Sequence, residues 1–206
     1  LSQGESRIDN IAYSEDILAT LSCLEAMGAK IKKDGDTVTV VGTLPMRAES
    51  CLYPCRESGS TLRFFVPLAM LSESVSQFTG YGRLMERPME VYESIALEKG
   101  ITYIKNSSGI TVGGKLTAGK LKVPANISSQ FITGLIFALV HLGEDAAIQI
   151  VPPFESRSYI DLTIAALKSF GADIKFEDDF NIAIKKSRLH SFSGKAEGDY
   201  SNAAFL

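Results

Sequence analysis

The sequence contains little cysteine and little histidine, which limits the chemistry that the chain can support. Its 206 residues include three cysteines and two histidines. A small, odd number of cysteines excludes a disulfide framework, so a reduced, cytoplasmic setting is expected. Cys51 and Cys55 are spaced like half of a zinc site, but the sequence has no second pair of such ligands. We therefore predict ordinary thiols and no metal.

The chain also lacks an excess of basic charge and any long apolar run. Its formal net charge of -3 argues against a broad nucleic-acid-binding surface and restricts any anion site to a local cluster. No segment reaches the roughly 18 uninterrupted apolar residues of a membrane span. The first residues, LSQGES, do not have the basic-then-apolar layout of an export signal. We expect a globular protein that is not exported and binds neither nucleic acid nor membranes.

Familiar catalytic patterns are absent as well. The sequence has no Ser/His/Asp set, phosphate-binding P-loop or dinucleotide-binding fingerprint, so no cofactor is predicted. It offers instead basic and hydroxyl residues at the starts of expected helices. Such groups bind anions without supplying an obvious acid and base.

Three stretches of the sequence resemble one another at a spacing of about 70 residues. In each, a helical pattern stops at a glycine and is followed by a short strand, a polar turn and a second strand. The stretches begin at Ser14, Glu86 and Ser156, and their glycines are Gly28, Gly100 and Gly171. We predict one pseudo-symmetric domain whose repeats cover approximately 1–44, 45–115 and 116–197.

A second kind of helix lies between these stretches. Two helices of this kind are expected. One opens with ESGSTLRFF, residues 57–65, and the other lies in ANISSQFITGLIFALVHLG, residues 125–143. Both segments place hydroxyl caps before nearly continuous apolar residues, and a helix that is apolar on every side must be buried. We predict a mixed α/β (α+β) fold with these helices inside and the sheets outside.

The two ends of the sequence suggest a portion of a longer protein. LSQGESRIDNIAYSED resembles the close of a buried helix and the strand that follows it, whereas GDYSNAAFL, residues 198–206, resembles the opening of another helix. A complete protein rarely leaves such half-helices without packing partners. We expect an excised domain.

Four polar groups at helix starts are candidate anion sites. Gly59 lets backbone N–H groups approach a ligand closely, although Ser60 could equally be a simple helix cap. Ser128, Ser129 and Gln130 supply more polar groups than a cap needs. The other two groups are Arg83 with Arg87, in GRLMERPM, and Ser156 with Arg157 and Tyr159, in ESRSYID. Solvated surface side chains are the alternative interpretation of both.

Five motifs in this order resemble one family. GESGSTLRF-like, RPM, SSQF, SxSYID and GDxSNAAF are similar to motifs of the 5-enolpyruvylshikimate-3-phosphate synthase family, and the resemblance covers the whole chain. It implies βαβαββ units, three to each of two domains, and transfer of enolpyruvyl from phosphoenolpyruvate to the 5-hydroxyl of shikimate 3-phosphate. It also implies that residues 1–206 are the domain between two crossover segments of an enzyme that is a monomer when whole.

The resemblance also implies roles for particular residues. Gly59 and Arg87 would hold phosphoenolpyruvate, and Gln130 would lie between both ligands. Ser128, Ser129 and Ser156 would hold shikimate 3-phosphate, with Tyr159 lining its pocket. The acid and base would come from absent segments, so this chain contains no catalytic residue and is expected to be silent alone. Arg63 matches a family arginine near the first loop.

The sequence departs from the family pattern at the first loop. Glu57 stands where asparagine is usual, and Ser60 where threonine is usual. A carboxylate beside two anionic ligands should weaken phosphoenolpyruvate binding unless it points away or pairs with a cation. The sequence therefore does not decide how Glu57 affects phosphoenolpyruvate affinity or sensitivity to the inhibitor glyphosate.

Two alternative functions remain. A UDP-N-acetylglucosamine enolpyruvyl transferase domain would carry a reactive cysteine between a strand and a helix, where Cys51 and Cys55 lie. An RNA-binding module built from the same βαβαββ unit would instead show basic residues and exposed aromatic residues across a sheet. The acidic balance of the chain disfavours that second reading.

Overall fold

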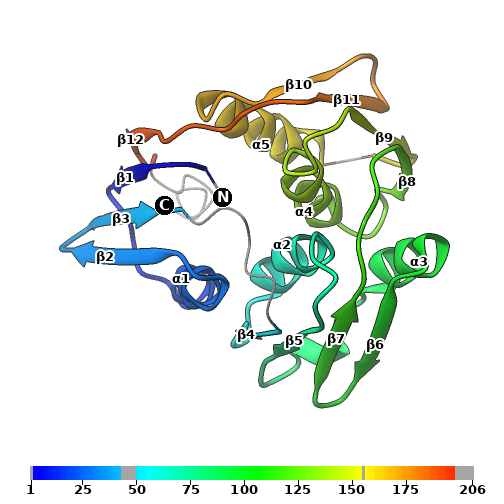
Figure 1. The fold of residues 1–206 in the computed structure, drawn as a ribbon, viewed down its shortest axis with the longest axis horizontal. Coiled ribbons are helices and arrows are strands. Elements are labelled where there is room, and N and C mark those ends of the chain that lie inside the picture. The colour runs from blue at the N-terminus through cyan, green and yellow to red at the C-terminus, as the bar shows by residue number, and fades with distance from the viewer. Residues whose placement is uncertain (1, 43–49, 155, 198–206) are drawn as a thin grey trace, which may run out of the picture.

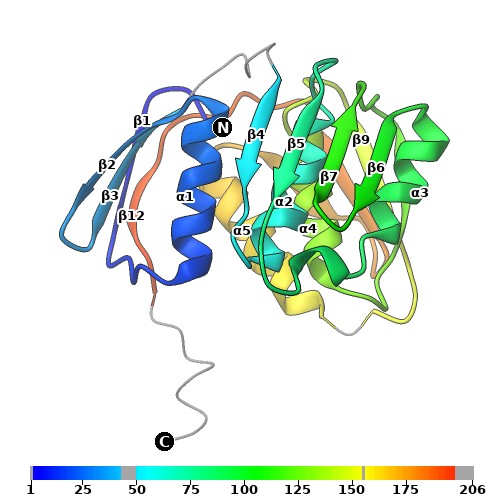
Figure 2. The same cartoon turned by 90° about the horizontal axis from the view of Figure 1, so that it is seen from below.

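Three four-stranded sheets form the outside of the domain. The computed structural model describes residues 2–42, 50–154 and 156–197. Each sheet joins a parallel pair of strands to an antiparallel pair. Figure 1 shows the sheets around the edge of the molecule with helices between them, and Figure 2 shows the same arrangement from below. The mixed α/β fold predicted from the sequence, with helices inside and sheets outside, is confirmed.

Two complete βαβαββ units occupy the middle of the chain. The first contains β4 (Cys51–Pro54), α2 (Gly59–Ala69), β5 (Ser76–Thr79), the short 3-10 helix η1 (Leu84–Glu86), α3 (Glu90–Lys99), β6 (Thr102–Asn106) and β7 (Gly109–Gly113). The second contains β8 (Lys120–Pro124), α4 (Ser129–Leu139), β9 (Ala146–Val151), α5 (Arg157–Ser169), β10 (Asp173–Phe176) and β11 (Asn181–Lys185). Their strand orders, β4-β5-β7-β6 and β8-β9-β11-β10, match element for element.

The remaining sheet unites the two ends of the described chain. It is built from β1 (Glu5–Asp9), β2 (Lys30–Asp34), β3 (Thr37–Val41) and β12 (Ser193–Lys195), and the helix α1 (Glu15–Met27) follows β1. β12 pairs parallel to β1 as β4 pairs with β5, so residues 193–195 complete this sheet although the approximate sequence boundaries placed them in the third repeat. The segment 198–206, expected to open a helix, lies outside the described residues.

Left-handed glycines end the repeated helices as the pattern predicts. Gly28 caps α1 with φ 109°, and Gly100 caps α3 with φ 68°. A residue with a Cβ is strained in this conformation, so glycine allows the chain to turn directly from the helix into a strand. At its other end α1 is capped by Ser14, whose Oγ accepts the N–H of Ile17.

The helices α2 and α4 are buried along almost their whole length and pack against each other. A Cβ added to Gly134 of α4 would collide with the carbonyl oxygen of Arg63 and with the hydroxyl of Tyr92. Pro67 has no N–H to donate to that carbonyl, four residues earlier. Tyr92 replaces the missing bond by donating its hydroxyl to Arg63 O at 2.7 Å. Glycine, proline and tyrosine thus act together at the α2–α4 contact.

Candidate functional site

The start of α2 is a capped helix entrance with a free first N–H group. Ser58 is its N-cap, and Ser58 Oγ accepts the N–H of Thr61 at 3.2 Å. The interpretation of Ser60 as the cap is therefore wrong, because the helix begins two residues too early for it. Gly59 is the first helical residue and is buried, so its N–H has no partner within the helix.

Arg87 lies directly over Gly59. A Cβ added to Gly59 would be 2.9 Å from Arg87 Nη1 and 3.0 Å from Arg87 Cδ. Only a residue without a side chain therefore allows the guanidinium to rest on the helix start. The backbone of Arg87 is held from two sides, since its N–H donates to Leu84 O and its carbonyl accepts from Lys105 Nζ at 2.7 Å.

Arg63 joins the entrances of α2, α3 and α4. It follows Gly59 by four residues, which puts both on one face of the helix. Only 8% of Arg63 is exposed. Its Nη1 donates to Gln130 Oε1 at 2.8 Å, and its Nη2 donates to Pro88 O at 3.4 Å. The guanidinium also lies 4.9 Å from the ring centre of Phe131, a cation–π contact.

The two guanidinium groups in this region form no ion pair with a described carboxylate. Among residues 2–42, 50–154 and 156–197, neither Arg63 nor Arg87 forms an ion pair. Burial lowers the pKa of Arg63, and the nearby charge of Arg87 lowers it further. Arg63 Nε is buried without a hydrogen-bond partner in the described structure. Two neighbouring guanidinium groups without a counter-ion favour an anionic ligand.

The carboxylate of Glu57, which lies in the same pocket as Arg87, is directed at the backbone of the neighbouring turn. Its Oε1 accepts the N–H of Arg83 at 3.3 Å, and a Cβ on Gly82 would collide with its carboxylate. Glu57, Arg83, Glu86, Arg87 and Pro88 line a surface pocket of about 310 Å³. The side chain of Arg83 pairs with Glu86 instead, Nε to Oε2 at 2.8 Å. Of the two arginines in GRLMERPM, Arg87 alone lies against Gly59.

The start of α4 carries the polar group predicted there. Ser128 is the N-cap, with Oγ accepting the N–H of Gln130 at 3.3 Å. Ser129 is the first helical residue and is buried. The cap therefore uses one hydroxyl, and Ser129 and Gln130 have other environments. Gln130 is half-buried and is the group that contacts Arg63.

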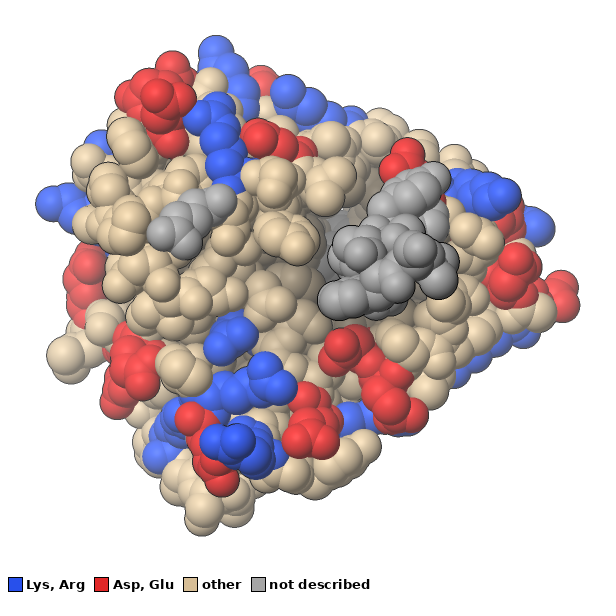
Figure 3. All heavy atoms as spheres, turned by 180° about the vertical axis from the view of Figure 1, so that it is seen from behind, with Lys and Arg blue, Asp and Glu red and all other residues tan. Residues whose placement is uncertain are grey.

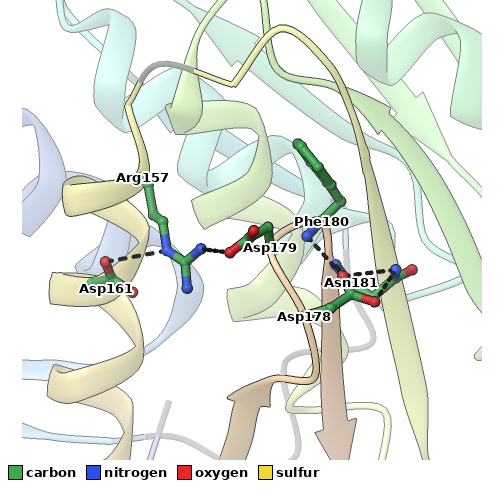
Figure 4. Close-up of polar contacts among 6 residues, drawn as sticks. All are labelled: Arg157, Asp161, Asp178, Asp179, Phe180 and Asn181. Atoms are coloured by element: carbon green, nitrogen blue, oxygen red, sulfur yellow. Dashed lines mark hydrogen bonds and ion pairs between the residues drawn. The ribbon is translucent and has the colours of Figure 1, made fainter.

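The start of α5 is organised differently. Ser156 occupies the cap position without making a capping hydrogen bond, and Tyr159 is 62% exposed. Figure 4 shows that Arg157 extends from α5 toward the turn between β10 and β11, where Nη1 donates to Asp179 at 2.8 Å. Arg157 also lies 4.3 Å from the ring centre of Phe176. This arginine therefore holds α5 to its own sheet.

The turn that receives Arg157 is itself ordered by a carboxylate. Asp178 accepts the N–H groups of Phe180 and Asn181, each at 2.8 Å, and the side-chain amide of Asn181. The backbone N–H of Phe180 is the main reason that the pKa of Asp178 is below its usual value. The second arginine-containing entrance is thus part of a structural network.

The structure brings some predicted site residues together and leaves others apart. Gly59, Arg87 and Gln130 are connected through their common neighbour Arg63. Within the described part of the chain, no hydrogen bond connects Ser156 or Tyr159 side chains to them. Sequence reasoning undervalued Arg63; the signal available was its spacing of four residues from Gly59 on an otherwise apolar helix.

Other features of the described residues bear on the alternatives. Cys55 is fully buried with its Sγ 3.9 Å from Cys23 Sγ, and Cys51 Sγ donates to Ala26 O, so neither is an exposed loop thiol. On the face drawn in Figure 3, acidic and basic side chains are intermingled instead of forming a basic stripe. No described helix has the length and apolarity needed to cross a membrane. Nor do any three described His, Cys, Asp or Glu side chains gather as metal ligands would.

The fold is similar to that of solved enolpyruvyl transferase structures. The EPSP synthase from Acinetobacter baumannii superposes with a TM-score of 0.80 at 22% identity, covering 100% of this chain and 47% of that one. The enolpyruvyl transferase NikO from Streptomyces tendae gives a TM-score of 0.61 at 18% identity, over 98% of this chain and 48% of that one. The fold is therefore of the enolpyruvyl transferase class.

Sequence comparison narrows this class to one family. The family model for EPSP synthase (3-phosphoshikimate 1-carboxyvinyltransferase) matches residues 1–206. The 3-phosphoshikimate 1-carboxyvinyltransferase of Clostridium beijerinckii is 43% identical over 216 residues, and that of Clostridioides difficile is 38% identical over 218 residues. Both alignments cover 100% of this chain and 50% of the relative. The chain belongs to the EPSP synthase family and spans about half the length of these curated relatives.

Proposed function

We propose that this chain is the part of an EPSP synthase that receives phosphoenolpyruvate and shikimate 3-phosphate. The observation that supports the proposal most strongly is the cluster of Gly59, Arg87, Arg63 and Gln130, with two neighbouring guanidinium groups that form no ion pair with a described carboxylate. Both ligands are anions, and arginine binds carboxylate and phosphate groups in a fork that lysine cannot match.

The arrangement gives each residue a chemical task. The reaction begins when the 5-hydroxyl of shikimate 3-phosphate attacks C2 of phosphoenolpyruvate while C3 takes up a proton. The proton of the attacking hydroxyl passes to a base. The resulting tetrahedral intermediate then loses phosphate together with a proton from C3, which restores the carbon–carbon double bond. Arg87 and the free N–H of Gly59 would bind phosphoenolpyruvate, and positive charge at this position stabilises the departing phosphate. Gln130 would donate N–H groups between the two ligands.

The hydroxyl groups at the starts of α4 and α5 complete the proposed site. Ser128, Ser129 and Ser156 would hold shikimate 3-phosphate, and the exposed ring of Tyr159 would cover one side of it. Ser156 makes no capping hydrogen bond, which leaves its hydroxyl available for a ligand. Tyr159 projects into solvent, as a side chain that lines an open pocket would.

The chain is proposed to lack the reacting acid and base. None of the proposed binding groups is a free carboxylate or imidazole with a ligand-facing position, so proton transfer would depend on a second domain of the same enzyme. Closure of two domains would also exclude water and align the reactants, an effect worth roughly 7–11 kcal/mol of a barrier. The 206-residue chain alone is therefore expected to bind without turnover.

Glu57 need not prevent anion binding in this arrangement. Its Oε1 accepts the backbone N–H of Arg83, so the carboxylate points toward the backbone at Gly82 and Arg83. We expect it to weaken phosphoenolpyruvate binding modestly, since it still shares a pocket with Arg87. Replacing Glu57 by glutamine keeps the acceptor oxygen and removes the charge, and should raise the affinity for phosphoenolpyruvate.

Titration calorimetry of the chain tests the proposed function. Shikimate 3-phosphate should bind, and phosphoenolpyruvate should bind more tightly when shikimate 3-phosphate is present. UDP-N-acetylglucosamine and single-stranded RNA at physiological salt serve as the competing ligands. Preference for either of these would replace the proposal by the corresponding alternative. Mixing the chain with the other half of an EPSP synthase should then release phosphate only when both substrates are present.

A further inference from the structure

Gln130 is held in one orientation by a neighbour that can only donate. A guanidinium has N–H donors and no acceptor, so the carboxamide atom that faces Arg63 Nη1 at 2.8 Å must be the oxygen. The NH2 group of Gln130 consequently points away from Arg63. Without this contact, rotation of the carboxamide by half a turn would present an oxygen to an anionic ligand and repel it.

Arg63 is itself fixed in place by contacts that a ligand cannot supply. Its Nη2 donates to Pro88 O, its guanidinium rests on the Phe131 ring, and its backbone carbonyl accepts the hydroxyl of Tyr92. Only 8% of the residue is exposed, so most of it is out of reach of solvent. Burying a guanidinium with an unpartnered Nε lowers the stability of the fold. A functional role for Arg63 would explain why it is present despite that cost.

We propose that Arg63 is a positioning residue, which fixes the carboxamide of Gln130 so that both N–H donors face the anionic ligand. The inference rests on the proposed function, because it assumes that Gln130 touches ligand. Arg63 acts through Gln130, whereas Arg87 contacts the ligand directly. The entrances of α2 and α4 are thereby coupled into one site.

The contact can be tested without any ligand. In protein labelled with ¹⁵N in its glutamine side chains, the NH2 signal of Gln130 is assigned by its loss in Gln130→Ala. Arg63→Met keeps the length of the apolar stem and removes every donor, so it should shift that signal. Arg63→Lys keeps the charge and a donor and should shift it less. Arg7→Met, at an exposed arginine of β1, is the control and should leave it unchanged.

The functional role is tested by a double-mutant cycle on affinity for phosphoenolpyruvate, measured with shikimate 3-phosphate present. Arg63→Met and Gln130→Ala should each weaken binding by about tenfold, and the double variant should be little weaker than either one. Arg63→Lys should recover part of the loss, which also covers the case in which Arg63→Met does not fold. Gln130→Glu keeps the Arg63 contact but removes the donors, so it should bind as weakly as Gln130→Ala.

Each outcome has a defined meaning. Additive losses, or a Gln130 signal that ignores Arg63→Met, would overturn the positioning role. If the wild-type chain binds neither probe, the proposed function fails, and the Gln130 signal still decides whether Arg63 orients the amide.

Discussion

The entrances of α2 and α4 share a network of contacts, whereas the entrance of α5 is tied to a separate part of the molecule. Arg63 joins the first two by its bond to Gln130. Arg157, the first residue of α5, instead reaches Asp179 in the turn of its own sheet (Figure 4). An arginine near a helix start therefore does not by itself indicate an anion-binding site. Its partners decide whether its charge remains available to an anion.

This difference predicts two kinds of subsite. The anion subsite at the entrances of α2 and α4 is formed before ligand binds, whereas the subsite at the entrance of α5 is open to solvent. Gly59, Arg63 and Gln130 lie in buried or half-buried surroundings that restrict their motion. Tyr159 is 62% exposed, and Ser156 makes no capping hydrogen bond. Substitutions on the α2–α4 side should consequently have larger effects than substitutions on the α5 side.

The largest effect is expected from Arg87→Met. This change removes the exposed guanidinium at the α2 entrance without disturbing a described ion pair. Affinity for phosphoenolpyruvate should fall about a hundredfold, equivalent to about 2.7 kcal/mol, as for loss of a charge-assisted contact. Calorimetry with shikimate 3-phosphate present measures the loss. Arg7→Met is the control, and an equal loss in both variants would show that general charge explains the binding.

Tyr92→Phe should produce the next largest effect, on stability. Its hydroxyl donates to Arg63 O at 2.7 Å and lies 3.1 Å from Phe131 O, linking α3 to both buried helices. Pro67 cannot supply a replacement N–H, so the Arg63 carbonyl would lose its partner. The free energy of unfolding in urea should fall by about 2 kcal/mol. An unchanged urea midpoint would mean that water satisfies this carbonyl.

Gly59→Ala should reduce affinity while leaving the fold intact. The new Cβ would meet Arg87 Nη1 at 2.9 Å and Cδ at 3.0 Å, so the arginine must shift. Phosphoenolpyruvate should bind about tenfold more weakly, about 1.4 kcal/mol. Shikimate 3-phosphate alone should bind as it does to wild type, because the change is on the α2 side. Equal weakening of both ligands would indicate a general distortion.

Arg157→Met should have the smallest effect. Its partners Asp179 and Asp161 are exposed, and pairs of this kind contribute under about 1 kcal/mol. Loss of the contact with Phe176 adds little more. Phosphoenolpyruvate affinity should stay within about twofold of wild type. A loss as large as that of Arg87→Met would erase the distinction between the two entrances.

Much of the fold was predictable from the sequence because its signals are local. Gly28 and Gly100 end helices by their own backbone freedom, and the apolar content of residues 129–139 requires burial wherever that helix lies. Pairing of β12 with β1 was not predictable in this way. It joins strands from opposite ends of the described chain, and three residues of strand carry almost no periodic signal.

The candidate site was predictable at the level of residue type and less so at the level of partners. Hydroxyl, glycine and arginine residues at helix starts were visible in the sequence. The bond between Arg63 and Gln130 spans 67 positions and depends on the close α2–α4 contact at Gly134, which no local pattern encodes. The same applies to Ser58, which takes the cap that one of the two interpretations gave to Ser60, since helix boundaries shift by a residue or two.

A crystal structure of the 206-residue chain with phosphoenolpyruvate and shikimate 3-phosphate would test the central claim most directly. The account predicts electron density for phosphoenolpyruvate between Gly59 and Arg87, within hydrogen-bond distance of the Gln130 amide. Density for that ligand beside Arg157 at the start of α5, with the α2 and α4 entrances empty, would contradict it.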